Sequence, residues 1–174
     1  MSGNLSTRLF AIPVAVILAA GVGLAQLKVA VVDLGRAVLE TAEVKKLSKE
    51  MEAKYTPRQR QIEKVQKELQ TLEQQAQATA GKLTPQAQAD LEAQYQRKQR
   101  ELQRLDEDLR ADVSNERQEI LTRSERKMRD LIRKLAEEKQ FDLVVEKNDT
   151  LYFKHVLEIT NDAIAAYDKA YPVK

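Results

Sequence analysis

The chain has 174 residues, of which 32% are charged and 5% aromatic, with no Cys, one His and a formal net charge of +2 at pH 7. Without Cys the chain cannot form disulfides, use thiolate catalysis or bind zinc through thiolates, and so small a net charge gives no support for charge-driven nucleic-acid binding. Few aromatic residues beside abundant Ala, Leu, Glu, Lys, Arg and Gln indicate long helices rather than one large globular core.

Residues 1–25 have the composition of a secretory signal peptide. Arg8 supplies a positive n-region, the segment from Leu9 to Val22 is apolar or small throughout, and Ala25 ends a short segment that a signal peptidase can cleave. The apolar segment is shorter than the roughly 20 residues that span a bilayer. We therefore predict cleavage and export to the periplasm. The alternative is an uncleaved N-terminal helix that tethers a structural coiled-coil scaffold to the membrane.

The mature chain begins with a short segment of β-branched residues. Within residues 28–33, the four positions from Val29 to Val32 are apolar on both faces of an extended chain, which predicts a buried strand. Asp33 then precedes a helix whose free amides its carboxylate can cap. Thr41 is placed to cap a second helix after a break near residues 40–42.

Two long helices that fold back on each other are expected between about Arg36 and Gln140, with the break at residues 40–42 near the start of the first. The spacing between successive apolar residues alternates between three and four, which is the heptad pattern of a helix packed against a partner helix. Thr84 can cap the second helix, with Pro85 at its first position, so the turn should lie at residues 81–85. If the helices form a symmetric hairpin, Ile62 faces Leu105 and Val65 faces Leu102. The predicted seam consists of Ile62, Val65, Leu69, Leu72, Leu91, Tyr95, Leu102 and Leu105.

The first long helix is irregular near its middle. The spacing from Met51 through Tyr55 to Ile62 departs from the heptad pattern, which predicts a local change in winding. Pro57 removes one backbone hydrogen bond, so a bend is expected there. The bend is either a flex point of the arm or a tolerated kink.

Charge on the hairpin is uneven. Ten basic and six acidic residues lie between Lys54 and Arg104, a net of +4, whereas residues 105–140 have a net of −1. A basic outer half can attract acidic, unfolded or membrane-surface partners, although a surface of this charge is also ordinary for a soluble helix. The candidates for contact with such partners are Tyr55, Arg58, Lys64, Lys82, Arg97 and Arg100.

No part of the sequence indicates an enzyme. Acid pairs such as Glu137 and Glu138 lie in helices of alternating charge, and a bare coiled coil offers no pocket to shift their pKa values. Beyond residue 25 the only glycines are Gly35 and Gly81, too few for a phosphate-binding loop. We expect no catalysis, no cofactor, no metal and no nucleotide.

The C-terminal part should return to strands. Residues 141–146 and 151–153 predict a hairpin around a turn at 147–150. A last helix is expected from Asp162 to about Tyr171, capped by Thr160 or Asn161. So few strands and one helix bury little apolar area, which argues for self-association.

In the order of its segments the chain resembles the Skp/OmpH family of periplasmic chaperones. The resemblance lies in residues 28–33, in Asn115-Glu116-Arg117 with Glu119-Ile120-Leu121, in residues 141–145, in Leu151-Tyr152, and in Glu158-Ile159-Thr160 before the last helix. A leading signal peptide and a central charged hairpin complete it.

The resemblance implies a mostly α fold with a small β body, assembled as a jellyfish-like homotrimer. The body would comprise residues 26–40 and 136–174, and a helical arm would comprise residues 41–135. Three arms would enclose unfolded outer-membrane proteins without ATP. By this resemblance the body contacts between copies would come from Val29, Val31, Leu143, Val145, Leu151 and Phe153.

We therefore expect an exported, ATP-independent holdase for unfolded outer-membrane proteins. The alternative is the exported or tethered coiled-coil scaffold described above. An intracellular nucleic-acid binder would need a dense basic block beside a zipper, and the sequence has none, so neither nucleic acid nor nucleotide is expected as a partner.

Overall fold

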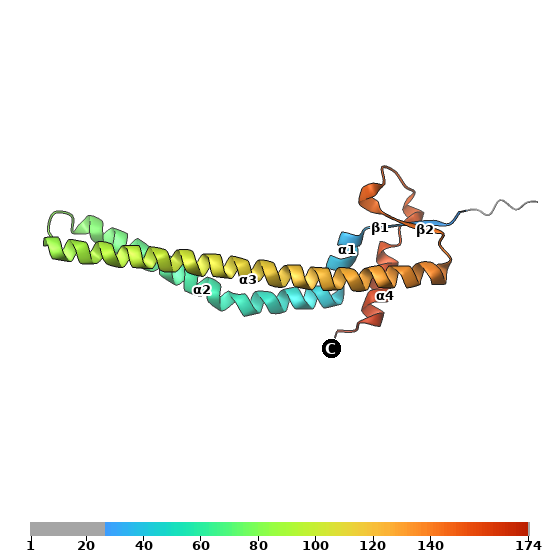
Figure 1. Cartoon of the computed structure of the whole chain (residues 1–174), viewed down its shortest axis with the longest axis horizontal. Helices are drawn as coiled ribbons and strands as arrows, with labels where there is room; N and C mark the ends of the chain where they lie inside the picture. Colours follow the sequence, from blue (N-terminus) through green and yellow to red (C-terminus); the bar gives the residue numbers. More distant parts are fainter. Residues whose placement is uncertain (1–26, 174) are drawn as a thin grey trace, which may run out of the picture.

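A computed structural model describes residues 27–173, and the predicted signal peptide lies outside them. The chain folds into a short two-stranded sheet with small helices at one end and a long helical hairpin that projects from it (Figure 1). The elements in order are β1 (Val29–Val32), α1 (Leu34–Leu39), α2 (Ala42–Ala78), α3 (Pro85–Lys139), β2 (Leu143–Glu146), the 3₁₀ turns η1 (Lys147–Asp149) and η2 (His155–Leu157), and α4 (Thr160–Ala170).

The two long helices differ in length, and this difference determines where β2 meets β1 and in which direction it runs. At about 1.5 Å per residue, the 37 residues of α2 span about 56 Å and the 55 residues of α3 about 83 Å. The chain therefore returns beyond its starting point, and the Asp142 amide donates to the Lys28 carbonyl at 2.8 Å. β2 begins beside the first residue of β1 and runs parallel to it, with Val29 opposite Leu143.

The predicted strand at residues 151–153 is wrong. Within the described residues, β2 pairs with β1 alone, and the chain after it turns through η1 and η2 instead of folding back as a hairpin. The other edge of β1 is met at one position by Glu158, whose neighbour Ile159 donates its amide to the Val31 carbonyl at 2.8 Å. Leu151 is fully exposed as a result.

Helix ends follow the predicted caps except at α4. The Asp33 carboxylate accepts from the Arg36 amide at 2.9 Å, and the Thr41 and Thr84 hydroxyls each accept from an amide three residues on at 3.3 Å. The cap predicted at Thr160 or Asn161 is wrong, because α4 begins at Thr160 itself. The Thr160 hydroxyl accepts instead from the Asp33 amide at 3.0 Å, so it joins α4 to β1.

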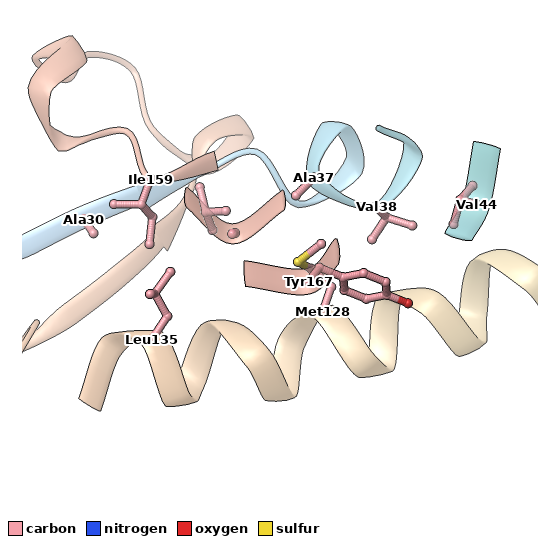
Figure 2. Packing of buried hydrophobic residues seen from close by; sticks show 10 residues of the cluster. Ala30, Ala37, Val38, Val44, Met128, Leu135, Ile159 and Tyr167 are labelled. Carbon is pink, nitrogen blue, oxygen red and sulfur yellow. The ribbon is translucent and has the colours of Figure 1, made fainter. Parts of the chain in front are cut away.

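The main hydrophobic core lies at the base of the arm. Strand β1, helices α1 and α4 and the end of α3 contribute to it, and Tyr167 and Met128 are its largest fully buried side chains (Figure 2). Val44, from the start of α2, is also buried there. The division into a body (26–40 and 136–174) and an arm (41–135) stays a prediction, and this core draws on both.

A second, smaller core lies between α2 and α3 further along the arm. Tyr55, Ile62 and Leu109 are its buried members, so the chain keeps one face of α2 against α3 on both sides of Pro57. Tyr55 and Ile62 are seven residues apart, which is one heptad, so both can face α3. Pro57 lies inside a continuous helix, and Figure 1 shows α2 curving along α3.

Candidate functional site

Two surfaces could carry function, the open side of the body and the sides of the arm. On the body, large apolar side chains are left in solvent at Leu143, Leu151, Tyr152 and Val156, with exposed fractions of 48% to 108%. Three of the four lie within residues 151–156, and exposed apolar patches mark interaction sites in soluble proteins. The outer edge of β2 is free of strand partners within the described chain, so its backbone groups are also available.

The six residues predicted to make body contacts between copies differ in how exposed they are in one chain. Val31 is buried within the chain's own fold, Val29, Val145 and Phe153 are half-buried, and Leu143 and Leu151 are exposed. Val29 lies opposite Leu143 and Val31 opposite Val145 across the two strands. Leu151 and Phe153 lie in the segment between η1 and η2 rather than in a strand.

Glu158 ties this exposed segment to the rest of the body. Its Oε1 accepts from Arg36 Nη2 at 3.1 Å and from the Thr160 hydroxyl at 3.0 Å, and Lys147 Nζ lies 3.5 Å away. The hydrogen bond from Thr160, then the charges of Lys147 and Arg36, hold the pKa of Glu158 below its usual value. The carboxylate is therefore ionised at neutral pH and anchors both ends of the segment from η1 to α4.

A polar cluster joins the arm to α4. The Tyr167 hydroxyl donates to Glu43 Oε2 at 2.5 Å, and Lys127 Nζ donates to Glu43 Oε1 at 2.8 Å. Burial alone would raise the pKa of Glu43, but the hydrogen bonds from Lys127 and Tyr167 outweigh it and lower the pKa. Burial and the bond to Glu43 raise the pKa of Tyr167. Lys127 also lies over the Tyr171 ring, 4.6 Å from its centroid.

A second polar cluster brackets Pro57 on the arm. The Tyr55 hydroxyl and Lys54 Nζ both donate to Glu116 Oε2, at 2.6 and 2.7 Å, and Arg58 pairs with Asp112 at 2.5 Å. The hydrogen bond from Lys54, then that from Tyr55, lowers the pKa of Glu116. The hydrogen bond to Glu116 raises the pKa of Tyr55. These contacts cross from α2 to α3 where Pro57 lacks its amide donor.

The prediction that Tyr55 contacts clients is therefore corrected, because the structure places this residue inside the hairpin. Its side chain is 6% exposed and packs between the helices, one heptad before Ile62. Arg58 is half-buried and paired with Asp112. The other candidates, Lys64, Lys82, Arg97 and Arg100, are exposed. Among these, Lys64 and Arg97 line one groove, described next, while Lys82 lies in the turn at the tip.

The predicted seam residues lie where α2 and α3 face each other, but the seam closes only near the arm's middle. Ile62 and Val65 are buried, and the remaining six (Leu69, Leu72, Leu91, Tyr95, Leu102 and Leu105) are half-buried. Two hollows open beside it. One, of about 440 Å³, lies at the tip and is lined by Leu72, Ala76, Leu83, Leu91 and Tyr95, among others. The other, of about 650 Å³, has Lys64, Lys67, Arg97 and Lys98 in its lining.

Residues 27–173 hold no cluster of three or more His, Cys, Asp or Glu side chains placed to bind a metal ion. Over the same residues, no helix has the length and apolar character needed to cross a membrane.

Sequence reasoning missed the residues that connect distant elements. Glu43 and Glu158 were not expected to make such contacts, and Thr160 was expected only to cap its own helix. Their partners lie more than 80 positions away in most cases. The acids beside the tip hollow, Glu73 and Glu92, were also missed. Their signal was present, because each directly follows a predicted seam residue and so must flank the seam.

Known proteins with a similar sequence pattern and a similar fold can be identified. Residues 28–167 match the family model described as outer membrane protein (OmpH-like). A comparison with curated proteins found no match. Among solved structures, a candidate outer membrane chaperone (OmpH-like) from Caulobacter crescentus CB15 aligns with a TM-score of 0.70 and 16% identity, over 87% of this chain and 90% of that one. At this identity the likeness shows a shared fold.

Proposed function

The chain belongs to the family of OmpH-like outer membrane proteins, and from this premise we propose that it is an ATP-independent holdase chaperone of the periplasm. Its clients would be unfolded outer-membrane proteins, held between helical arms so that they cannot aggregate. The structural relative's description as a candidate outer membrane chaperone supports this role. The observation that carries the proposal is the helical hairpin, whose longer helix is about 83 Å long and reaches from the core at its base to a tip far from it.

Self-association of the body supports the caging mechanism. A single chain leaves Leu143, Leu151, Tyr152 and Val156 in solvent and one edge of β2 unpaired. Copies that cover these groups would gain apolar burial and backbone hydrogen bonds that one chain lacks. We propose the homotrimer that the family resemblance implies, with one arm from each copy around a common cavity.

The surface of the arm suits clients that share no structure. Lys64, Lys82, Arg97 and Arg100 are exposed on its outer half, beside half-buried seam residues such as Leu72 and Tyr95. Each contact of this kind is weak, but several arms acting on one chain raise the overall affinity by keeping the local concentration high. The same basic side chains would allow contact with a membrane surface.

An aggregation assay tests the function. An unfolded β-barrel membrane protein is diluted from denaturant, and light scattering is followed with and without the purified chain, in the absence of ATP. We expect scattering to fall as the chain is added in stoichiometric amounts. Equal scattering in both samples would show that the chain is no holdase for this client class.

Two further measurements test the assembly and its location. Mass measurement in solution should give three copies, and a monomer would rule out the cage. The N-terminus of the protein taken from the periplasm should follow residue 25. An N-terminus at Met1 in a membrane fraction would favour the tethered scaffold instead.

A further inference from the structure

The outer part of the arm has no enclosed core. Between Val65 and Leu109, a stretch that lies wholly within the described residues, every side chain is at least partly exposed. The buried seam residues end at Val65 on α2 and Leu109 on α3, and the seam beyond them consists of half-buried Leu and Tyr side chains. Two helices by themselves cannot cover the sides of an apolar seam, so it stays open on both faces of the hairpin.

The two hollows beside this seam lie on opposite faces of the hairpin. Glu73 and Glu92, in the tip hollow, each follow a seam residue by one position, whereas Thr71 and Gln94, in the basic groove, each precede one. In an antiparallel pair of helices these positions face opposite sides. Leu72 lies in the seam itself and lines both hollows.

The faces differ in charge as well as position. The tip hollow, called here the tip crevice, has apolar walls with Glu73 and Glu92 as the charged groups among its lining residues. Within the described chain neither carboxylate forms an ion pair, and Glu92 accepts one hydrogen bond, from Gln96 at 3.4 Å. In the basic groove Lys98 pairs with both Glu68 and Glu101, and Lys64 lies 4.0 Å from Glu68. Its lining has four basic and two acidic side chains, so its net charge is positive.

We propose that the tip crevice docks polypeptide segments in which an aromatic side chain lies next to Lys or Arg. The ring would enter the apolar crevice, whose volume of about 440 Å³ is in the range of ligand pockets. The neighbouring cation would pair with Glu73 or Glu92, which lack a basic partner of their own. The proposal rests on the proposed function, because the segments would belong to the unfolded client.

A peptide-binding assay with the full purified chain tests this. A fluorescent, unstructured peptide of alternating Phe and Arg is compared by anisotropy with one in which Glu replaces Arg. We expect the Phe-Arg peptide to bind more tightly. Because exposed ion pairs each contribute about 0.2–1 kcal/mol, removing both with Glu73→Gln and Glu92→Gln should weaken its binding about 2- to 30-fold.

The arm offers a matched control. Glu63 and Glu107 are exposed acids outside the tip crevice, and Glu107 accepts from Gln103 much as Glu92 accepts from Gln96. Glu63→Gln with Glu107→Gln removes the same net charge and should leave Phe-Arg binding unchanged. Three results would contradict docking in the tip crevice. They are equal affinity for the two peptides, tighter binding of the peptide with Glu in place of Arg, and equal weakening by both double variants.

The aggregation assay separates this proposal from the holdase function. If the chain suppresses client aggregation but shows no preference for the Phe-Arg peptide, the proposed docking at the tip crevice is wrong and the proposed holdase function is retained. If the peptide preference is present and depends on Glu73 and Glu92 but aggregation is not suppressed, the docking site stands and the holdase is wrong.

Discussion

The hydrogen bond between Tyr167 and Glu43 offers a direct test of how α4 holds the base of the arm. Tyr167→Phe keeps the ring in the core and removes the hydroxyl, which donates to Glu43 Oε2 at 2.5 Å. The ring is fully buried and keeps its place, so besides this bond the change removes the hydroxyl's contact with the buried Ser124 side chain. Tyr171→Phe, four residues later, is the matched control, because no other described residue forms a hydrogen bond with its hydroxyl.

The expected loss follows from the charge of the acceptor. A hydrogen bond to an ionised group contributes about 1.5–3 kcal/mol. The Glu43 carboxylate is 20% exposed and keeps its bond from Lys127, so the loss should lie near the lower end, about 1.5 kcal/mol. For a chain of this size that corresponds to a Tm lowered by about 3–6 °C. Tyr171→Phe should cost less than about 0.5 kcal/mol.

The lowered pKa of Glu43 predicts how the stability difference between wild type and Tyr167→Phe changes with pH. The pKa of Glu43 is lowered in the folded protein from its ordinary value of 4.5. Stability linked to a lowered carboxyl pKa is complete above the ordinary value and is lost as the pH falls below it. The difference between wild type and Tyr167→Phe should therefore be largest at neutral pH and shrink as the pH falls below 4.5.

Urea unfolding, followed by circular dichroism at one fixed protein concentration, measures these differences. Fixed concentration is needed because association would contribute to stability. The reasoning is refuted if Tyr167→Phe and Tyr171→Phe lower stability equally at neutral pH. A Tyr167→Phe difference that stays constant well below pH 4.5 would show that the ionised carboxylate is not the partner that matters.

Three further changes probe other parts of the molecule. Met128→Ala removes a fully buried side chain and should lower the free energy of unfolding by about 2–5 kcal/mol, and a loss below about 1 kcal/mol in urea unfolding would contradict its place in the core. Glu158→Ala should release residues 150–157, seen as faster amide hydrogen exchange there with little change in α3; unchanged exchange would show that Glu158 is no anchor. Thr84→Ala should cost about 1 kcal/mol and speed exchange in the first turn of α3, whereas full protection there would show that the cap is dispensable.

The exceptions among the sequence predictions share one cause. Thr160 was expected to cap its own helix, but its hydroxyl accepts from the Asp33 amide, 127 positions earlier in the chain. Residues 151–153 have the composition of a strand and β2 keeps a free edge, yet the chain turns away through η1 and η2 and brings Glu158 against β1 instead. Each depends on where distant segments arrive, and composition over a few residues carries no such information.

Tyr55 shows a different kind of error. Its distance from Ile62 is one heptad, so the seam could have been extended to it from the sequence. Pro57 between them suggested that the register breaks. The structure keeps α2 continuous through Pro57, and contacts from Tyr55 and Lys54 to Glu116 join it to α3 on this stretch.

The sequence by itself determined the helical hairpin and its caps at Asp33, Thr41 and Thr84, because heptad spacing and capping depend on residues within one or two turns. Tertiary structure alone decided that the two strands run parallel. That outcome depends on α3 being 18 residues longer than α2, which returns the chain to the start of β1. It also decided which polar side chains meet at the base of the arm, since Glu43, Lys127 and Tyr167 come together only once α2, α3 and α4 have packed.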